Sequence, residues 1–186
     1  SSWLKPVSDP NDSKPGWQFC RAAQLACVTE ISNTGMAVTY DIGDEDDIHP
    51  RNKRDVGERL ALWPLARDYG RKVYFSGPLY KSTAIDGNKL RVLFSYAEVG
   101  LMIGKKEGQN EVEEIKSGKL QGFAIAGEDR VWHWADAIIE NDCVVVSSPL
   151  VDKPVAVRYA FSMNPQGANL YNKVGLPASP FRSDCW

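Results

Sequence analysis

The segment Asp44-Glu45-Asp46-Asp47-Ile48-His49-Pro50 holds the residues of this sequence that are best suited to chemistry. Asp46 stands three residues before His49, which is one of only two histidines. At that spacing a carboxylate can accept a hydrogen bond from one imidazole nitrogen, which fixes the tautomer and leaves the other nitrogen free to act as a base. Pro50 restricts the backbone of His49 to extended conformations. The segment predicts half of a catalytic triad, with His49 as general base and Asp46 as its orienting carboxylate.

Two other interpretations of this segment stay open. The acidic residues 44–47 can form a solvated surface turn that carries His49 as an ordinary surface side chain. The carboxylates of Asp44, Asp46 and Asp47 could instead bind a divalent cation, although the segment lacks the glycine and the terminal glutamate of an EF-hand loop.

Candidates for a nucleophile are weak. The sequence contains neither a Gly-x-Ser-x-Gly nor a Gly-Asp-Ser motif. Ser76 has no recognisable context, and Cys20 and Cys27 fall in an apolar helical pattern, which predicts buried and inert thiols. The chain is therefore expected to lack the serine that an Asp–His pair would activate.

The elements that must position His49 lie before residue 70. Residues 16–30 have helical periodicity, and residues 36–40 are typical of a short buried strand. Asn52 is expected to cap a second helix, which continues through Val56, Leu60, Trp63 and Tyr69 and ends at Gly70. His49 would then lie between a strand and a helix, in a mixed α and β region that spans residues 1–70.

Residues 71–186 have an all-β pattern. Short β-rich runs at 89–95, 121–126, 131–139, 143–147 and 154–161 alternate with turn signals, and residues 86–88 and 140–142 are expected to be hairpin turns. Strands of this length and spacing predict a small β-sandwich or jelly roll. Residues 164–186 are rich in Pro, Gly and Asn and are expected to form an irregular tail. His133, between two tryptophans, is expected to be a packed structural histidine.

Composition bounds the function. The 186 residues are 43% hydrophobic and 25% charged, which fits one globular domain, or part of one with a second small domain. The net charge of −2 and the lack of a Lys/Arg-rich run argue against nucleic acid as a partner. No segment approaches the roughly 20 apolar residues that a membrane-spanning helix needs. The chain begins Ser-Ser-Trp without a signal-peptide pattern, which we interpret as a processed or partial chain.

The four cysteines, Cys20, Cys27, Cys143 and Cys185, contain no CxxC pair, so neither a metal site nor a cofactor is expected. On one helix Cys20 and Cys27 would lie about 10 Å apart, too far for a disulfide. Which of the four cysteines pair, if any, stays open. Asn11-Asp12-Ser13 fits the N-glycosylation pattern and favours the secretory pathway.

Several motifs together resemble a known family. The most specific is Asp47-Ile48-His49-Pro50-Arg51-Asn52-Lys53, which is followed by Val56-Gly57-Glu58-Arg59-Leu60. Others, spread over nearly the whole chain, include Trp17, Arg21 and Gln24, Gly35-Met36-Ala37-Val38-Thr39, Ser76-Gly77-Pro78 and Pro154-Val155-Ala156-Val157-Arg158-Tyr159. They resemble the SGNH (GDSL-like) hydrolases, specifically the sialate O-acetylesterases and related carbohydrate acetylesterases.

The resemblance implies an α/β plus β fold. Residues 1–70 would be the C-terminal part of a flavodoxin-like SGNH hydrolase domain, and residues 71–186 a small β-sandwich region. It implies that His49 is the catalytic base and Asp46 its partner, with Asp47 or Asp44 as alternatives, while Arg21 and Gln24 support the site structurally.

The resemblance also implies partners for the chain. The family's nucleophile serine and oxyanion residues come from upstream motifs that this sequence lacks. An N-terminal chain of the same precursor would supply them, and an odd cysteine such as Cys185 could join the two. The implied substrate is an O-acetylated sialic acid or a related acetylated sugar, with no cofactor, in a secreted, lysosomal or periplasmic protein. This chain alone is expected to be inactive.

A second hypothesis is a non-catalytic carbohydrate-binding β-sandwich. Trp132, Trp134 and Tyr159 would then form a face on which sugars stack. Alternation along a strand places Trp132 and Trp134 on one side, where they could bind together or pack together.

Overall fold

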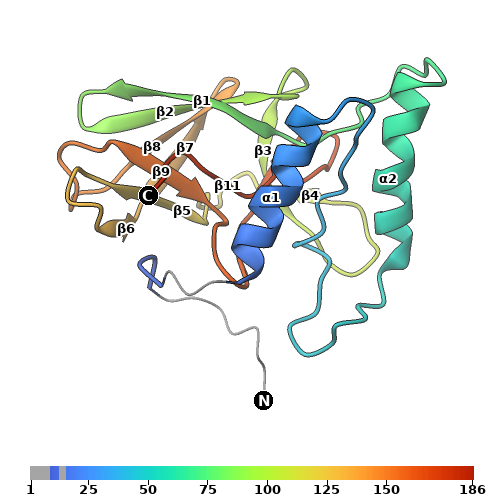
Figure 1. The fold of residues 1–186 in the computed structure, drawn as a ribbon, viewed down its shortest axis with the longest axis horizontal. Coiled ribbons are helices and arrows are strands. Elements are labelled where there is room, and N and C mark those ends of the chain that lie inside the picture. The colour runs from blue at the N-terminus through green and yellow to red at the C-terminus, as the bar shows by residue number, and fades with distance from the viewer. Residues whose placement is uncertain (1–8, 13–15) are drawn as a thin grey trace.

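The computed structural model describes residues 9–12 and 16–186. Two helices, α1 (Trp17–Glu30) and α2 (Lys53–Arg67), precede a series of short strands. The strands are β1 (Leu79–Asp86), β2 (Lys89–Ser95), β3 (Leu101–Lys105), β4 (Glu113–Glu114), β5 (Phe123–Ala126), β6 (Trp132–Trp134), β7 (Asp136–Glu140), β8 (Cys143–Ser147), β9 (Ala156–Tyr159), β10 (Leu170–Asn172) and β11 (Phe181–Arg182). Figure 1 shows the sheets on one side of the molecule and α2 at the opposite edge. This mostly antiparallel structure with two helices is compatible with the expected α/β plus β fold.

Two four-stranded antiparallel sheets, β1-β2-β8-β7 and β11-β9-β5-β6, share one apolar core. Every second residue of β2 (Leu90, Val92 and Phe94) points into that core, as the alternation of a half-buried strand predicts. Phe123, Ile125, Val157, Tyr159 and Phe181 enter it from the other sheet. A third sheet, β10-β3-β4, lies nearer to the helices. No helix among the described residues is long and apolar enough to cross a membrane.

Local turn chemistry places several strands where the sequence predicts them. β2 and β8 have the predicted bounds, and α1 begins one residue inside its predicted range. Gly87 and Asn141, with φ of 61° and 57°, occupy the left-handed region in the hairpins β1–β2 and β7–β8. Glycine and asparagine tolerate this conformation at least cost, so these two turns were predictable.

The run 131–139 is not the single strand that the sequence predicts. It forms β6, which pairs with β5, and β7, which pairs with β8 in the other four-stranded sheet. The break falls at Ala135, whose N–H still donates to the carbonyl of Phe123. The chain therefore passes from one sheet to the other at this residue, and its uninterrupted β pattern conceals the crossing.

Residues 36–40 do not form the strand that the sequence predicts. The carbonyl oxygen of Met36 accepts from the indole of Trp63 at 2.9 Å, and that of Val38 from the Arg59 guanidinium at 2.5 Å. Side chains of α2 thus occupy the backbone acceptors that a neighbouring strand would use. Within the described residues no strand pairs with this segment through its backbone.

The C-terminal segment 164–186, expected to be irregular, contributes β10 and β11 to two different sheets. Leu170, Tyr171, Ala178 and Phe181 are buried. Their β pattern is only two or three residues long between prolines and glycines, which leaves too few residues to show a period of two.

Gly77 should not tolerate a side chain. A Cβ there would lie 2.0 Å from the carbonyl oxygen of Pro177, where the chain entering β1 crosses the C-terminal segment. We expect Gly77→Ala to destabilise the protein by about 1–3 kcal/mol, since backbone must move to make room. Gly57→Ala is the matched control, because nothing lies within 4 Å of a Cβ at this helical position. It should stabilise the protein by about 1 kcal/mol through helix propensity. Urea unfolding of both variants measures the difference, and equal midpoints would contradict the clash.

Candidate active site

His49 lies in the loop between residues 41 and 52, ahead of α2. Its side chain is 80% exposed, and its Nδ1 lies 3.9 Å from a carboxylate oxygen of Asp47. The backbone N–H of His49 donates to the same oxygen at 2.8 Å, while the N–H of Asp46 donates to the Asp44 carboxylate at 2.9 Å. Each of these is an Asx turn, in which an aspartate holds the backbone two residues ahead.

The structure therefore brings Asp47 nearest to the imidazole, through a long and solvent-exposed contact. The pairing of Asp46 with His49 stays a prediction, with Asp47 and Asp44 as the alternatives. In this geometry the loop is also a solvated acidic turn. Within residues 9–12 and 16–186 no group of three or more His, Cys, Asp or Glu side chains is placed to hold a metal ion, so the cation-loop interpretation finds no support.

The loop begins at a buried ion pair. Both carboxylate oxygens of Asp41 accept from the Arg59 guanidinium, at 2.6 and 2.8 Å, and the Tyr171 hydroxyl donates to the second oxygen at 3.1 Å. The side chains of Arg59 and Asp41 are only 8% and 3% exposed. Burial alone would lower the pKa of Arg59, but the hydrogen bonds and charge of Asp41 outweigh it and raise that pKa above its ordinary value. Arg59 therefore stays charged and holds the start of the loop against α2.

The loop ends at a second polar cluster. The Asn52 side chain accepts from the Asp55 N–H at 3.1 Å, which confirms the predicted N-cap of α2. Its amide also donates to the Asp55 carboxylate at 2.7 Å and to the carbonyl of Gly108 at 2.9 Å. Lys106 completes the cluster through an ion pair with Asp55 at 2.5 Å. These contacts join the helix start to the connection between β3 and β4.

The face of α2 that packs against the protein is mostly polar. Its buried residues are Asp55, Arg59 and Trp63, spaced four apart and therefore aligned on one side. Leu60 and Tyr69, which an apolar stripe would place inside, are 51% and 75% exposed. The predicted helix forms but ends at Arg67, short of the predicted Gly70. Its buried face was not predicted, because Asp55 pairs with Lys106 and Arg59 with Asp41, both outside the helix.

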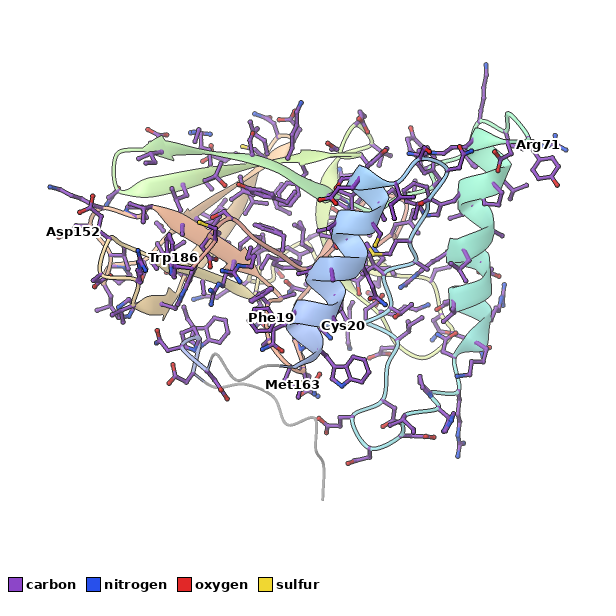
Figure 2. The ribbon with its side chains drawn as sticks, in the orientation of Figure 1. Phe19, Cys20, Arg71, Asp152, Met163 and Trp186 are labelled. Carbon is purple, nitrogen blue, oxygen red and sulfur yellow. The ribbon has the colours of Figure 1, made fainter. Side chains whose placement is uncertain are left out.

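A cavity of about 1350 Å³ opens beside the loop. Asp44, Asp47 and Ile48 line it from the loop, Trp17 and Arg21 from α1, and residues 163–169 from the connection between β9 and β10. Met163 lies beside the first turn of α1 (Figure 2), and its sulfur accepts from the N–H of Trp17 at 3.3 Å. The volume of the cavity is large enough for a sugar. Loop residues on either side of Asp46 and His49 line the cavity, but these two residues themselves do not.

Arg21 has the supporting role expected of it. Its guanidinium donates to the carbonyl oxygens of Ser162 and Met163, so it joins α1 to the segment that borders the cavity. Burial lowers the pKa of Arg21 from its ordinary value. Gln24 is exposed and is not among the residues that line the cavity.

The weak nucleophile candidates stay weak. Ser76 is buried, and its hydroxyl donates to the carbonyl of Gly77. The prediction that Cys20 and Cys27 are buried is wrong, since both are exposed (Figure 2 labels Cys20). α1 packs through Gln18, Arg21 and Leu25 instead. Cys143 and Cys185 are also free, so the structure contains no disulfide within the described residues.

Three tyrosine hydroxyls lie beneath the loop. Tyr40 and Tyr159 share a hydrogen bond of 3.0 Å, and the Tyr159 oxygen also accepts from the N–H of Leu170. Burial raises the pKa of Tyr40, Tyr159 and Tyr171 above the ordinary 10.0, with the charge of Asp41 adding to the effect. The fold therefore accepts only the neutral phenols.

Alkaline pH should unfold the protein through these groups. A raised pKa in the folded state means that their stabilisation is complete below about pH 10 and is lost as pH rises further. We expect the urea midpoint to fall above about pH 10, and to fall less steeply with pH in Tyr40→Phe. Tyr69→Phe, at an exposed position, is the matched control. The same pH slope in all three proteins would count against this account.

The structure does not form the aromatic face of the binding-module hypothesis. Trp132 and Tyr159 are buried, and Arg158 covers the Trp132 ring at 3.9 Å. Trp134 alone of the three is well exposed. The side chain of Asn11, in the glycosylation motif, is hydrogen-bonded: its amide donates to the Trp132 carbonyl and to Asp9, and its oxygen accepts from the Trp132 N–H. Ser13 of that motif lies outside the described residues.

Known proteins resemble most of this chain. No family model matches it. Sialate O-acetylesterases from Mus musculus and Homo sapiens are 31% and 30% identical to it over 165 residues, which is 82% of this chain but 28% and 29% of theirs. The crystal structure of a carbohydrate acetylesterase from Xanthomonas citri matches with 45% identity and a TM-score of 0.73, over 82% of this chain and 33% of that one.

The chain thus spans a third or less of the length of these relatives. This chain resembles these relatives both in sequence and in three-dimensional structure, and the sequence identity is high enough for a common fold to be expected. Over most of its length, this chain belongs to the family of sialate O-acetylesterases and related carbohydrate acetylesterases, of which it represents a partial region.

Proposed function

We propose that this chain is the His- and Asp-bearing part of a serine-type carbohydrate O-acetylesterase. The observation that carries the proposal is its 45% identity to a carbohydrate acetylesterase, in a structure where the His49 loop borders a large cavity. Residues 1–70 would complete a flavodoxin-like SGNH domain together with polypeptide not present here, and residues 71–186 would form the adjoining β-sandwich.

The proposed reaction is ester hydrolysis in two steps. A serine supplied by an N-terminal chain of the same precursor attacks the acetyl carbonyl carbon, while His49 takes the hydroxyl proton. Collapse of the tetrahedral intermediate breaks the bond to the sugar oxygen, which receives that proton from His49. Water, deprotonated by His49, then attacks the acetyl-serine, and collapse of this second intermediate releases acetate while the serine oxygen takes the proton back from His49. The carboxylate of Asp46 would hold the imidazole in the required tautomer.

The proposed substrate is an O-acetylated sialic acid or a related acetylated sugar. The support is the name of the mammalian relatives, together with a cavity lined by Trp17 and by polar side chains such as Gln121 and Asn169. Location in the secretory pathway stays a prediction from sequence, as does attachment of a partner chain through the exposed Cys185.

The test is intact mass under non-reducing and reducing conditions on protein from its natural source, combined with turnover of p-nitrophenyl acetate. A complex larger than 20.7 kDa that hydrolyses the ester would support a processed esterase with the serine on another chain. A lone chain of 20.7 kDa that turns the ester over would contradict a serine in trans. A lone inactive chain would mean either an isolated fragment or a non-catalytic binding module.

A further inference from the structure

The loop that carries His49 is held to the β region at both of its ends. At its start, the hydroxyls of Tyr171 and Tyr159 bind Asp41 and Tyr40. At its end, the carbonyl of Gly108 and the ammonium of Lys106 hold the cluster around Asn52 and Asp55. These contacts come from β9, β10 and the β3–β4 connection, which are 50 to 130 residues away in sequence.

A third contact reaches the middle of the loop. The amide of Asn164, in the connection between β9 and β10, donates to the Glu45 carboxylate at 3.2 Å. Glu45 lies one residue before Asp46 and four before His49. It is partly buried, while Asp44, Asp46, Asp47 and His49 are all exposed. Between its two fixed ends, the acidic segment is thus held to the β region through Glu45.

We infer that Asn164 is a positioning residue for the catalytic loop, acting through Glu45. The inference rests on the proposed function, since it assigns the β region a part in placing His49. Between the two ends, residues 42–51 are otherwise held by the burial of Ile42 and by the Asx turns at Asp44 and Asp47, and these turns are contacts within the loop itself. A displacement of about 1 Å at a catalytic base can cost up to about 100-fold in rate. The contact from Asn164 reduces the paths available to the part of the loop next to His49.

An exchange of hydrogen-bonding partners tests this inference. Asn164→Asp places a second carboxylate against Glu45 and should drive the loop away. Adding Glu45→Gln restores an amide–carboxylate hydrogen bond with donor and acceptor exchanged. Asn88→Asp is the matched control, because it makes the same chemical change at an exposed residue in the β1–β2 turn.

Two measurements are needed, hydrogen exchange of amides 44–49 and turnover of p-nitrophenyl acetate by the complete natural complex. We expect Asn164→Asp to speed exchange in this segment and to lower kcat by about 10- to 100-fold with KM little changed. The double variant should restore both, and Asn88→Asp should change neither. If Asn164→Asp acted only by lowering the stability of the fold, exchanging the two side chains would not be expected to restore exchange rates and kcat.

Each contrary outcome has a distinct meaning. Unchanged exchange at 44–49 in Asn164→Asp, or faster exchange with full kcat, would overturn the positioning role. Failure of the double variant to restore kcat would also overturn it. Failure of the proposed function would appear separately, as turnover that His49→Ala leaves intact.

Discussion

Replacing His49 with alanine is expected to lower kcat for p-nitrophenyl acetate by about 10⁴-fold or more in the complete complex. The imidazole is the proposed carrier of the proton in both steps, and alanine cannot accept or return it. KM should change little, because the imidazole contributes to the transition state more than to binding of the substrate. The folded state should be unaffected, since the His49 side chain is 80% exposed.

The chain contains its own matched control in His133, the only other histidine. It lies in β6, opposite Ile125 of β5. Its chain neighbours Trp132 and Trp134 are not among the residues that line the cavity, whereas Ile48 and Pro50, beside His49, are. His133→Ala should keep its kcat. Equal losses in both variants, or full activity in His49→Ala, would remove the basis for calling His49 the base.

The carboxylate partner can be identified in the same assay. The true partner, changed to its amide, should cost about 10⁴-fold in kcat because the imidazole takes the wrong tautomer. The sequence favours Asp46, whereas the structure places Asp47 nearest to Nδ1. Comparing Asp46→Asn, Asp47→Asn and Asp44→Asn decides between them, since only one should show a loss of that size.

Arg59→Ala is expected to destabilise the protein by about 3–5 kcal/mol. The change leaves the Asp41 carboxylate, 3% exposed, with the Tyr171 hydroxyl but without its ion-pair partner. It also removes the donor to the carbonyl of Val38. A charge confined in this way without its partner is far more costly than the loss of a surface contact. Urea unfolding of the variant measures the effect directly.

Arg54→Ala provides the comparison on the same helix. Arg54 pairs with Glu58 at 2.7 Å, but both side chains are more than half exposed. Water and salt screen such a pair, so no measurable change in stability is expected. Similar losses for Arg54→Ala and Arg59→Ala would show that burial of the Asp41–Arg59 pair is not what matters. Smaller destabilisation when Asp41→Leu accompanies Arg59→Ala would confirm that the unpaired charge causes the loss.

The sequence predicts features that short stretches of chain decide by themselves. The Asn52 cap, the turns at Gly87 and Asn141, and the strands β2 and β8 follow from residues within a few positions of each other. The sequence also places His49 in a loop ahead of a helix. In each case the responsible interaction is local, so the identity of neighbouring residues is enough to specify it.

Features that depend on distant residues were missed. Asp41 finds Tyr171 across 130 residues, and Glu45 finds Asn164 across 119. The buried face of α2 was misplaced for the same reason, because the sequence does not show which residues outside the helix will pair with Asp55 and Arg59. One signal was present: Asp55, Arg59 and Trp63 recur every four residues, which places two opposite charges and an aromatic ring on one side of the helix.

The polar face of α2 affects how this part of the molecule can fail. Two apolar surfaces can shift against each other in small displacements, each of which changes the free energy little. The hydrogen bonds made by Asp55, Arg59 and the indole nitrogen of Trp63 are directional. Because of this, α2 has no comparable intermediate positions against the rest of the protein. We therefore expect α2 to be either fully docked or detached. Loss of one of these hydrogen bonds should lower the fraction of competent molecules without changing the activity of each competent molecule.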